Sequence, residues 1–319
     1  MSLRNRRVLV TGSAGVIGRE VLRRLIDDDA VVLSVDREPL VDIGSQAIEH
    51  LRLDLANADL TMLADFDPHV VLHLAAAFER SRESPGFWPV NWHDNMLCSH
   101  RVVDLVSRTP SLEVFVFASS YLVYDAAQYM SADARVGAVR LPETSPKETR
   151  NVTGAAKLYT EAELDFVTEY LRPDIRTVFP RIFRAYGRGS RDVVSRWVRA
   201  ALAGESVQLY NAGNQFDYVY SGDVAEGLLR MALSERARGP INLATGVARR
   251  VRDLIDAIDS AVPGFALRVQ DEGNTEDFES SVADVELLQN TLGWAPGTTL
   301  GDGVAQVTEH ERSQALDDR

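Results

Sequence analysis

A glycine-rich segment near the N-terminus, TGSAGVIG at residues 11–18, constrains the fold of this chain more than any other feature. The apolar residues 8–10 before it predict a strand, and the spacing of apolar residues after it predicts a helix. A second apolar segment, residues 30–35, ends at the acidic residue Asp36. A strand, a glycine turn, a helix and a second strand that ends in an acid predict a βαβ unit.

The glycines of this turn have the spacing G-x-x-G-x-x-G, which fits a site for a dinucleotide. Gly12 permits a tight turn, Gly15 lets the backbone approach a pyrophosphate, and Gly18 lets the helix pack closely on the strand. The helix N-terminus adds amide donors and a positive dipole. Asp36 is placed to accept hydrogen bonds from ribose hydroxyls and to repel a 2′-phosphate, which favours NAD over NADP. Arg37 beside it is a weak counter-signal, and a glycine turn without a ligand is the alternative.

Apolar segments alternate with predicted helices over the first 180 residues. We expect strands at residues 51–53, 70–75, 114–118 and 175–179, and helices at residues 93–106 and 155–170. Such alternation predicts a doubly wound parallel sheet covered on both faces, the Rossmann α/β fold. Residues 1–180 are therefore predicted to form an NAD-binding Rossmann domain. Residues 181–319 are predicted to form a smaller, mixed α/β and mainly substrate-binding domain, with segments that return to the Rossmann sheet.

Composition narrows the range of partners. The net charge of −13 argues against nucleic acid or an anionic membrane as the main partner. No apolar run approaches the roughly 20 residues that cross a bilayer, and the N-terminus does not resemble a signal peptide. Cys98 is the only cysteine, which fits a reducing cytoplasm, and the histidines lack the spacing of metal ligands. We expect a cytoplasmic protein that binds neither metal nor membrane.

Together with the glycine turn, several later motifs resemble those of the extended short-chain dehydrogenase/reductase family, particularly its NAD-dependent epimerase/dehydratase branch. The resemblance covers nearly the whole chain. The matching segments are DL at 54–55, HLAA at 73–76, residues 81–85 with Asn91, ASSYLVY at 118–124, PRIFRAYG at 180–187, DYVYSGDV at 217–224 and LGWAP at 292–296.

This resemblance implies a set of residues that hold NAD along the carboxyl ends of the strands. They are Gly12, Ala14, Gly15, Val16, Ile17, Asp36, Arg37, Asp54, Leu55, Leu74, Ala75, Ala76, Asn91 and Lys157.

The resemblance also implies a reaction centre, from which one expected residue is missing. Family members use a tyrosine phenolate as the base, a lysine four residues later, and a serine or threonine that binds the reacting oxygen. The segment NVTGAAK at 151–157 aligns with Y-G-x-S-K, so Thr153 stands where the tyrosine belongs, while Ser120 and Lys157 are in place. An aliphatic hydroxyl titrates far above a phenol, so Thr153 cannot simply become the base. The candidates for that role remain Tyr121, Tyr124, Tyr159 and a water relayed through Lys157.

The expected substrate site also departs from the family. Members that use nucleotide sugars usually carry asparagine where Arg184 stands and arginine where Phe216 stands. The fork geometry of arginine suits phosphate or carboxylate. We therefore expect Ser120, Tyr121, Arg184 and Arg191 to bind substrate. The residues after Ser120 are Tyr121 and Leu122 instead of the Asp-Glu pair of the dehydratases, which argues against a 4,6-dehydratase.

The sequence thus predicts an NAD-dependent epimerase or oxidoreductase that acts on a sugar or nucleotide-sugar hydroxyl by hydride transfer to and from bound NAD, with non-standard acid/base chemistry. Two alternatives stay open, a catalytically silent NAD-binding regulatory protein and a reductase that consumes NADH. The family usually dimerises through two helices, which here correspond to residues 93–106 and 155–170, so we expect a homodimer.

Overall fold

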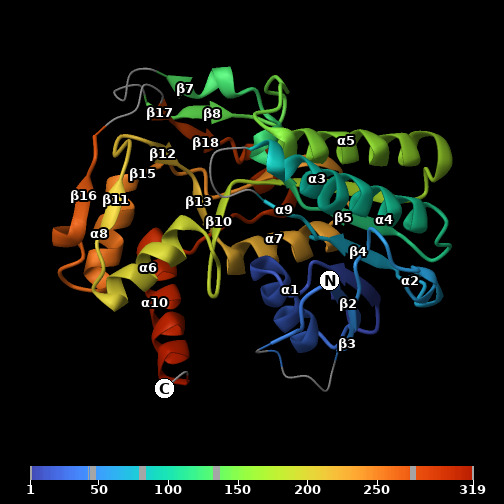
Figure 1. Cartoon of the computed structure of the whole chain (residues 1–319). Coiled ribbons are helices and arrows are strands. Elements are labelled where there is room, and N and C mark those ends of the chain that lie inside the picture. The colour runs from blue at the N-terminus through green and yellow to red at the C-terminus, as the bar shows by residue number, and fades with distance from the viewer. Residues whose placement is uncertain are drawn as a thin grey trace.

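A parallel sheet forms the centre of the computed structural model, which describes residues 2–41, 43, 48–78, 84–131, 137–273 and 278–317 (Figure 1). The strand order is β14-β9-β5-β4-β1-β2-β3, and the short strand β6 pairs with β9. The chain starts in the middle of the sheet at β1, builds one edge to β3, and then returns to build the other edge to β14. This is a doubly wound order. The bounds are β1 (Arg7–Thr11), β2 (Val31–Asp36), β3 (Glu49–Arg52), β4 (Val70–His73), β5 (Val114–Phe117), β6 (Ser119–Ser120), β9 (Arg176–Ile182) and β14 (Gly239–Leu243).

The central strands form because their side chains are apolar on both faces. Every residue of β4 and β5 is buried, and so is each residue of β1 after Arg7. Within β1, Val8 and Val10 belong to one hydrophobic cluster and Leu9 to another. Alternate residues therefore enter two separate cores, which is the pattern of a parallel sheet with helices on both faces.

The first of these cores contains residues of α1 (Val16–Asp27), α7 (Ser221–Leu233) and α9 (Glu286–Leu292). The second contains residues of α2 (Thr61–Asp65), α4 (Cys98–Ser107) and α5 (Val152–Phe166). The short helix α3 (Trp88–Asn91) lies beside α4 and α5 (Figure 1), and a π-helical turn at Trp92–Leu97 joins it to α4. Another π-helical turn, Val167–Leu171, continues α5.

A third hydrophobic cluster lies beyond the central sheet, between α6 (Val193–Ala203), α8 (Val251–Ala261) and α10 (Leu300–Asp317). Short paired strands connect this layer to the rest of the chain. The pairs are β10 (Arg184–Tyr186) with β13 (Tyr218–Tyr220), β11 (Val207–Leu209) with β16 (Val269–Asp271), β12 (Gln215–Phe216) with β15 (Arg249–Arg250), β7 (Met130–Ser131) with β17 (Phe278–Glu279), and β8 (Val139–Leu141) with β18 (Ser281–Ala283). Single 3₁₀ turns occur at Pro85–Phe87, Tyr121–Val123, Ala126–Gln128 and Ala266–Arg268.

The predicted fold class is confirmed. The elements α7, β14 and α9, all beyond residue 180, lie on the central sheet, whereas α6, α8 and α10 form the separate cluster. The division into domains at residue 180 stays a prediction.

A buried ion pair connects α5 to the central sheet. Arg181 at the end of β9 is fully buried and donates to both carboxylate oxygens of Glu161, over 3.0 Å from Nε and 2.7 Å from Nη2. Ser119 on β6 donates to the same carboxylate over 2.5 Å. Because Glu161 is on α5, these bonds fix the helix against the carboxyl ends of β6 and β9.

We predict that Arg181→Met lowers the free energy of unfolding by about 3–5 kcal/mol, because it leaves the Glu161 carboxylate buried without its partner. The double variant Arg181→Met/Glu161→Met should be more stable than Arg181→Met alone, since it removes both charges. Urea denaturation measures both effects. As a control, Arg4→Met removes the exposed Arg4–Asp29 pair and should cost less than about 1 kcal/mol. A double variant less stable than Arg181→Met would contradict this account.

Candidate active site

The glycine turn after β1 is shaped by close backbone contacts. Gly12 has a φ of 68°, and a Cβ on it would lie 2.5 Å from the backbone nitrogen of Ala75. A Cβ on Gly18 would collide with the carbonyl oxygen of Gly12, so helix α1 packs directly on the turn. Helix α1 begins at Val16, after Gly15, and the first amides of any α-helix lack partners within the helix. The amides of residues 16 and 17 in the first turn of α1, together with the glycine turn before them, therefore suit the binding of a dinucleotide pyrophosphate.

The carboxylate of Asp36 lies at the end of β2 beside this turn, where it accepts a hydrogen bond from the amide of Ala14 over 2.9 Å. Its neighbour Arg37 forms a bidentate pair with Asp94, with N–O distances of 3.0 and 2.9 Å. Because Asp94 already pairs with this guanidinium, Arg37 is less available to bind the 2′-phosphate of NADP. The geometry favours NAD over NADP.

Further predicted cofactor residues lie on the loops after β3 and β4. Asp54 accepts from the amide of Ala56 over 3.1 Å, and Leu55 beside it is buried. Leu74, Ala75 and Ala76 are half-buried immediately after β4. Their loop is fixed by a residue that the sequence analysis did not single out.

That residue is Asn95, which is buried in the π-helical turn before α4. Its side chain accepts from the amide of Ala77 over 2.8 Å and donates to the carbonyl of Ala77 over 2.9 Å. It also donates to the side chain of Asn91 over 2.7 Å. Asn91, a predicted cofactor residue, is thus connected to the loop after β4 through Asn95. Ser81, in the segment that resembles the family, lies outside the described residues.

His73 at the end of β4 serves a structural role. Its ring nitrogens lie 2.6 Å from the hydroxyl of Thr11 and 3.0 Å from that of Ser99. Burial lowers its pKa to about 3, with Lys157 acting in the same direction, so the ring is neutral. It bridges β1, β4 and α4 below the cofactor site.

Helix α5, which contains Thr153 and Lys157, packs closely on β6, where Ser120 lies, and on the loop after it. A Cβ on Gly154 would collide with the carbonyl oxygen of Leu122, and the amide of Arg150 donates to that oxygen over 3.2 Å. The first turn of α5, which contains Thr153, therefore rests on the residues that follow Ser120. Asn151 caps this helix by accepting from the amide of Gly154 over 2.8 Å.

Thr153 and Lys157 are four residues apart on α5 and therefore share one face of the helix. Both side chains are buried, at 3% exposure each. The ammonium of Lys157 lies 4.7 Å from the centroid of the Phe117 ring. Burial lowers the pKa of Lys157 from 10.5 to about 8, although Cys98 and Glu161 act in the opposite direction. A substantial fraction of this amine is therefore neutral slightly above physiological pH.

The three tyrosines considered as replacement bases are poorly suited to that role. The Tyr121 hydroxyl donates to Glu279 over 3.0 Å and that of Tyr124 to Asn242 over 2.6 Å, and burial raises both phenol pKa values. Tyr159 is 47% exposed. It follows Lys157 by two residues on α5, which turns it about 200° around the helix axis. The structure therefore disfavours all three tyrosines as the catalytic base.

Arg184, on β10, points its guanidinium at a carboxylate that the sequence did not reveal. Its Nη2 lies 2.8 Å from Oε2 of Glu279, and its guanidinium lies 4.1 Å from the centroid of the Phe216 ring. Arg191 is exposed just before α6, and no described contact links it to this cluster.

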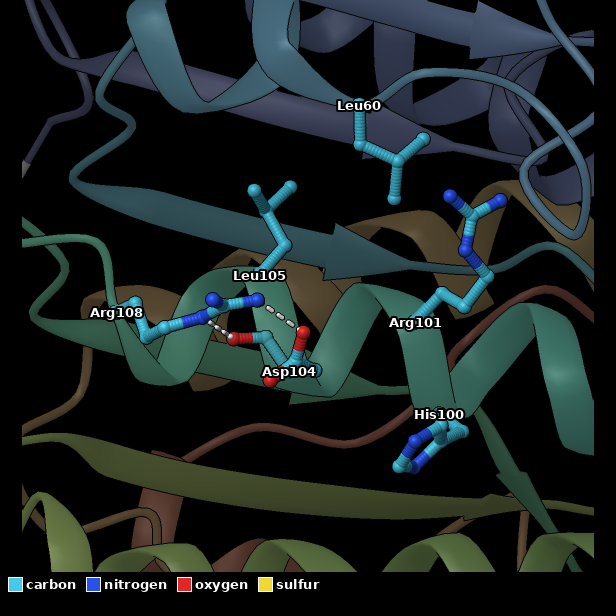
Figure 2. A pocket seen from close by; sticks show the side chains of 6 residues that line it. All are labelled: Leu60, His100, Arg101, Asp104, Leu105 and Arg108. Atoms are coloured by element: carbon cyan, nitrogen blue, oxygen red, sulfur yellow. Dashed lines mark hydrogen bonds and ion pairs between the residues drawn. The ribbon is translucent and has the colours of Figure 1, made fainter.

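Figure 2 shows a shallow pocket of about 140 Å³ on the outer side of α4. It is lined by Leu60, His100, Arg101, Asp104, Leu105 and Arg108, none of which is a predicted site residue. Asp104 and Arg108, four residues apart along the chain, form an ion pair on one side of it. Within the described ranges, no group of three or more His, Cys, Asp or Glu side chains could hold a metal ion, and no helix combines the length and apolar character needed to cross a membrane.

Comparison with known proteins assigns the chain to a family. The model of the NAD dependent epimerase/dehydratase family matches residues 8–244. The chain belongs to this family. Membership confirms the resemblance seen in the sequence, NAD as the cofactor, and an NAD-dependent epimerase or oxidoreductase as the class of enzyme.

Individual members of the family match the chain over almost its full length. A UDP-glucose 4-epimerase from Mycolicibacterium smegmatis is 27% identical over 325 residues, covering 97% of this chain and 99% of that protein. The structure of MoeE5 in complex with UDP-glucuronic acid and NAD is 29% identical, with a TM-score of 0.82 over 97% of this chain and 99% of that one. The complex of the Thermus thermophilus UDP-glucose 4-epimerase with NAD is 27% identical, with a TM-score of 0.79 over 96% and 99%.

We predict that Gly12→Ala weakens NAD binding at least about tenfold, because an alanine at positive φ is strained by about 1–2 kcal/mol and its Cβ would collide with Ala75. Gly239→Ala is the matched control, since Gly239 also has a positive φ, of 62°, but a Cβ there meets nothing within 4 Å. The control should lose stability and keep its NAD affinity. Calorimetric titration with NAD measures both variants, and unchanged affinity in Gly12→Ala would contradict the assigned turn.

Proposed function

We propose that this protein interconverts nucleotide sugars by oxidising and re-reducing one sugar hydroxyl with a single bound NAD. The observation that carries the proposal is the placement of Thr153 and Lys157 on one buried face of α5, against the loop after Ser120. This group lies at the same carboxyl edge of the sheet as the glycine turn. Gly12, Gly15 and Asp36 would hold NAD there, and the bound cofactor would supply reversible hydride transfer with the sugar carbon.

The chain's own residues handle the proton of the sugar hydroxyl. Ser120 ends β6 and is placed to bind the reacting oxygen. Lys157 in its neutral form is the proton acceptor that replaces the missing phenolate. The Thr153 hydroxyl, one helical turn before it on the same face, relays the proton from the sugar hydroxyl to the Lys157 amine. A base is most effective when its pKa is near the working pH, and the lowered pKa of Lys157 meets that condition.

The comparisons support a nucleotide sugar as substrate. The solved structures of MoeE5 contain UDP-glucuronic acid or UDP-glucose together with NAD, and this chain resembles them over 97% of its length. Of the predicted substrate residues, Ser120, Tyr121 and Arg184 come from adjoining elements, whereas Arg191 is exposed before α6.

We further propose a cytoplasmic homodimer that associates through α4 and α5. The outer side of α5 and the turn after it carries Tyr159, Phe166 and Tyr170, which are 47%, 54% and 65% exposed. Large aromatic side chains gathered on one surface are typical of protein interfaces.

The proton-acceptor role predicts a specific pH dependence. Only the neutral amine accepts a proton, so kcat/KM should rise with pH and level off above about 8, the pKa of Lys157. Lys157→Met should lower kcat by about 10²–10⁴-fold, the usual effect of removing a general base. Initial rates with UDP-glucose and UDP-glucuronic acid across pH 6 to pH 10 (roughly the range in which a group of this kind titrates) measure both. A rate that falls as pH rises through 8 would contradict the assignment.

Thr153→Val tests the relay, because valine keeps the shape of threonine and removes its hydroxyl. It should lower kcat and leave KM nearly unchanged, since the hydroxyl moves a proton and does not hold the nucleotide. Thr160→Val is the control on the same helix, where the hydroxyl donates to the carbonyl of Ala156.

Two results would favour the alternative functions. NAD binding without turnover would indicate a regulatory protein, and stoichiometric loss of NADH would indicate a reductase.

A further inference from the structure

Among the residues that the structure describes, a cluster of charged side chains beside the candidate reaction centre has an excess of positive charge. Arg150 and Arg184 both donate to Oε2 of Glu279, over 2.5 and 2.8 Å, and Tyr121 donates to Oε1 over 3.0 Å. The Glu279 side chain is only 4% exposed, whereas those of Arg150 and Arg184 are 29% and 36% exposed. The carboxylate forms the base of the cluster, and parts of both guanidinium groups stay accessible.

One carboxylate neutralises only one of the two guanidinium groups. Burial opposes the ionisation of Glu279, but attraction from Arg184 and Arg150 outweighs it and lowers its pKa, so Glu279 is charged at neutral pH. The three side chains together therefore carry one net positive charge around a buried carboxylate. Such a charge is costly unless a further anion compensates it.

Arg184 also has an unused hydrogen-bond donor. Its Nε is buried, and among the described residues it has no hydrogen-bond partner. Contact with the Phe216 ring, 4.1 Å from the guanidinium to the ring centroid, holds the planar group in place. A guanidinium held in this way binds a carboxylate or phosphate well, because its donors form a rigid fork.

The position of the cluster indicates which part of a substrate it faces. Tyr121 directly follows Ser120, and Arg150 precedes the cap of α5, three residues before Thr153. Arg184 begins β10, two residues after the end of β9. All of these positions adjoin the reaction centre and not the glycine turn. A nucleotide sugar carries a diphosphate next to the sugar, and a uronic-acid nucleotide carries a carboxylate on the sugar as well. We assign the cluster to the sugar carboxylate because its residues adjoin the reaction centre. Equal weakening of uronate and neutral nucleotide by Arg184→Asn would instead assign it to the diphosphate.

We propose that Arg150 and Arg184, held in place by Glu279, bind a carboxylate on the sugar, so that the protein selects uronic-acid nucleotides over their neutral counterparts. This inference rests on the proposed function. A sugar carboxylate supplies the missing negative charge and an acceptor for the buried donor of Arg184. A hydroxymethyl group supplies no charge and leaves the cluster uncompensated.

Glu279 has a different role in this site, since it positions the two arginines and is buried beneath them. Without its charge the guanidinium groups would repel each other. Glu279→Gln should therefore weaken uronate binding as well, although it removes a negative charge from the neighbourhood of an anionic ligand. A surface that bound anions by net charge alone would respond to Glu279→Gln by binding the uronate more tightly.

UDP-glucuronic acid and UDP-glucose differ at one group of the sugar, carboxylate against hydroxymethyl, and they form the test pair. Calorimetric titration of the NAD-loaded protein should give a Kd about 10- to 100-fold lower for UDP-glucuronic acid, the effect of one or two charge-assisted hydrogen bonds. Arg184→Asn and Arg150→Gln should each remove most of this preference by weakening only uronate binding. Arg184→Lys keeps the charge and loses the fork, so it should keep part of the preference. Arg252→Gln, on the exposed side of α8, is the control and should leave both Kd values unchanged.

The outcomes separate this inference from the proposed function. Equal binding of both nucleotides by the wild-type protein would overturn the inference and leave the proposed function standing. Binding of neither would overturn both. If Arg184→Asn misfolds, as a lost thermal transition would show, the Arg184→Lys and Glu279→Gln variants still test whether the cluster binds the sugar carboxylate. Tighter binding of UDP-glucuronic acid to Glu279→Gln would also overturn the positioning role.

Discussion

The buried ion pair between Glu161 and Arg181 sets the position of α5, and the rest of the candidate site depends on that position. It holds the middle of the helix against β6 and β9, while the contact between Gly154 and Leu122 holds its first turn against the loop after β6. Lys157 lies between these two fixed points, and Thr153 directly precedes Gly154. Packing of α5 on β6 and on the loop after it therefore sets the positions of both residues.

The predicted replacement of the expected tyrosine by Thr153 would change the electrostatics of the candidate site. In the family pattern a lysine lowers the pKa of the neighbouring phenol. The sequence predicts Thr153 at the position of that phenol. Burial lowers the pKa of Lys157 itself to about 8, and its ammonium lies 4.7 Å from the centroid of the Phe117 ring. The Glu161 carboxylate, one turn further along, is occupied by Arg181 and Ser119. Burial thus raises the pKa of Tyr121 and Tyr124 and lowers that of Lys157, which is the basis for proposing the amine as the proton acceptor.

Much of the fold could be predicted from the sequence because it follows from local patterns. Apolar segments predict β1, β2, β4 and β5. The glycine spacing predicts the turn, because Gly12 contacts the backbone just after the adjacent strand β4 and Gly18 contacts the backbone of the turn itself. Ser120, Thr153 and Lys157 could be located by motif. Their roles, like those of the other predicted site residues, stay predictions.

The parts that could not be predicted involve contacts between residues far apart in sequence. Glu279 reaches Arg184 and Arg150 from β17, and no periodicity connects these segments. Asp94 neutralises Arg37 from the π-helical turn before α4, and Asn95 in the same turn fixes the loop after β4. The burial of Tyr121 and Tyr124 in and after a 3₁₀ turn likewise follows from packing against distant segments. Arg184 was identified by its residue type, but its partner was not.

In the proposed reaction, hydride leaves and returns to the same sugar without exchange. The decisive measurement incubates the NAD-loaded protein with a nucleotide sugar deuterated at every non-exchangeable sugar carbon. The converted sugar is separated from the substrate by chromatography, and its mass is measured by mass spectrometry. We expect converted sugar that retains all its deuterium, with no labelled NADH released. Loss of one deuterium per turnover into free NADH, or no conversion of UDP-glucose and UDP-glucuronic acid, would contradict it.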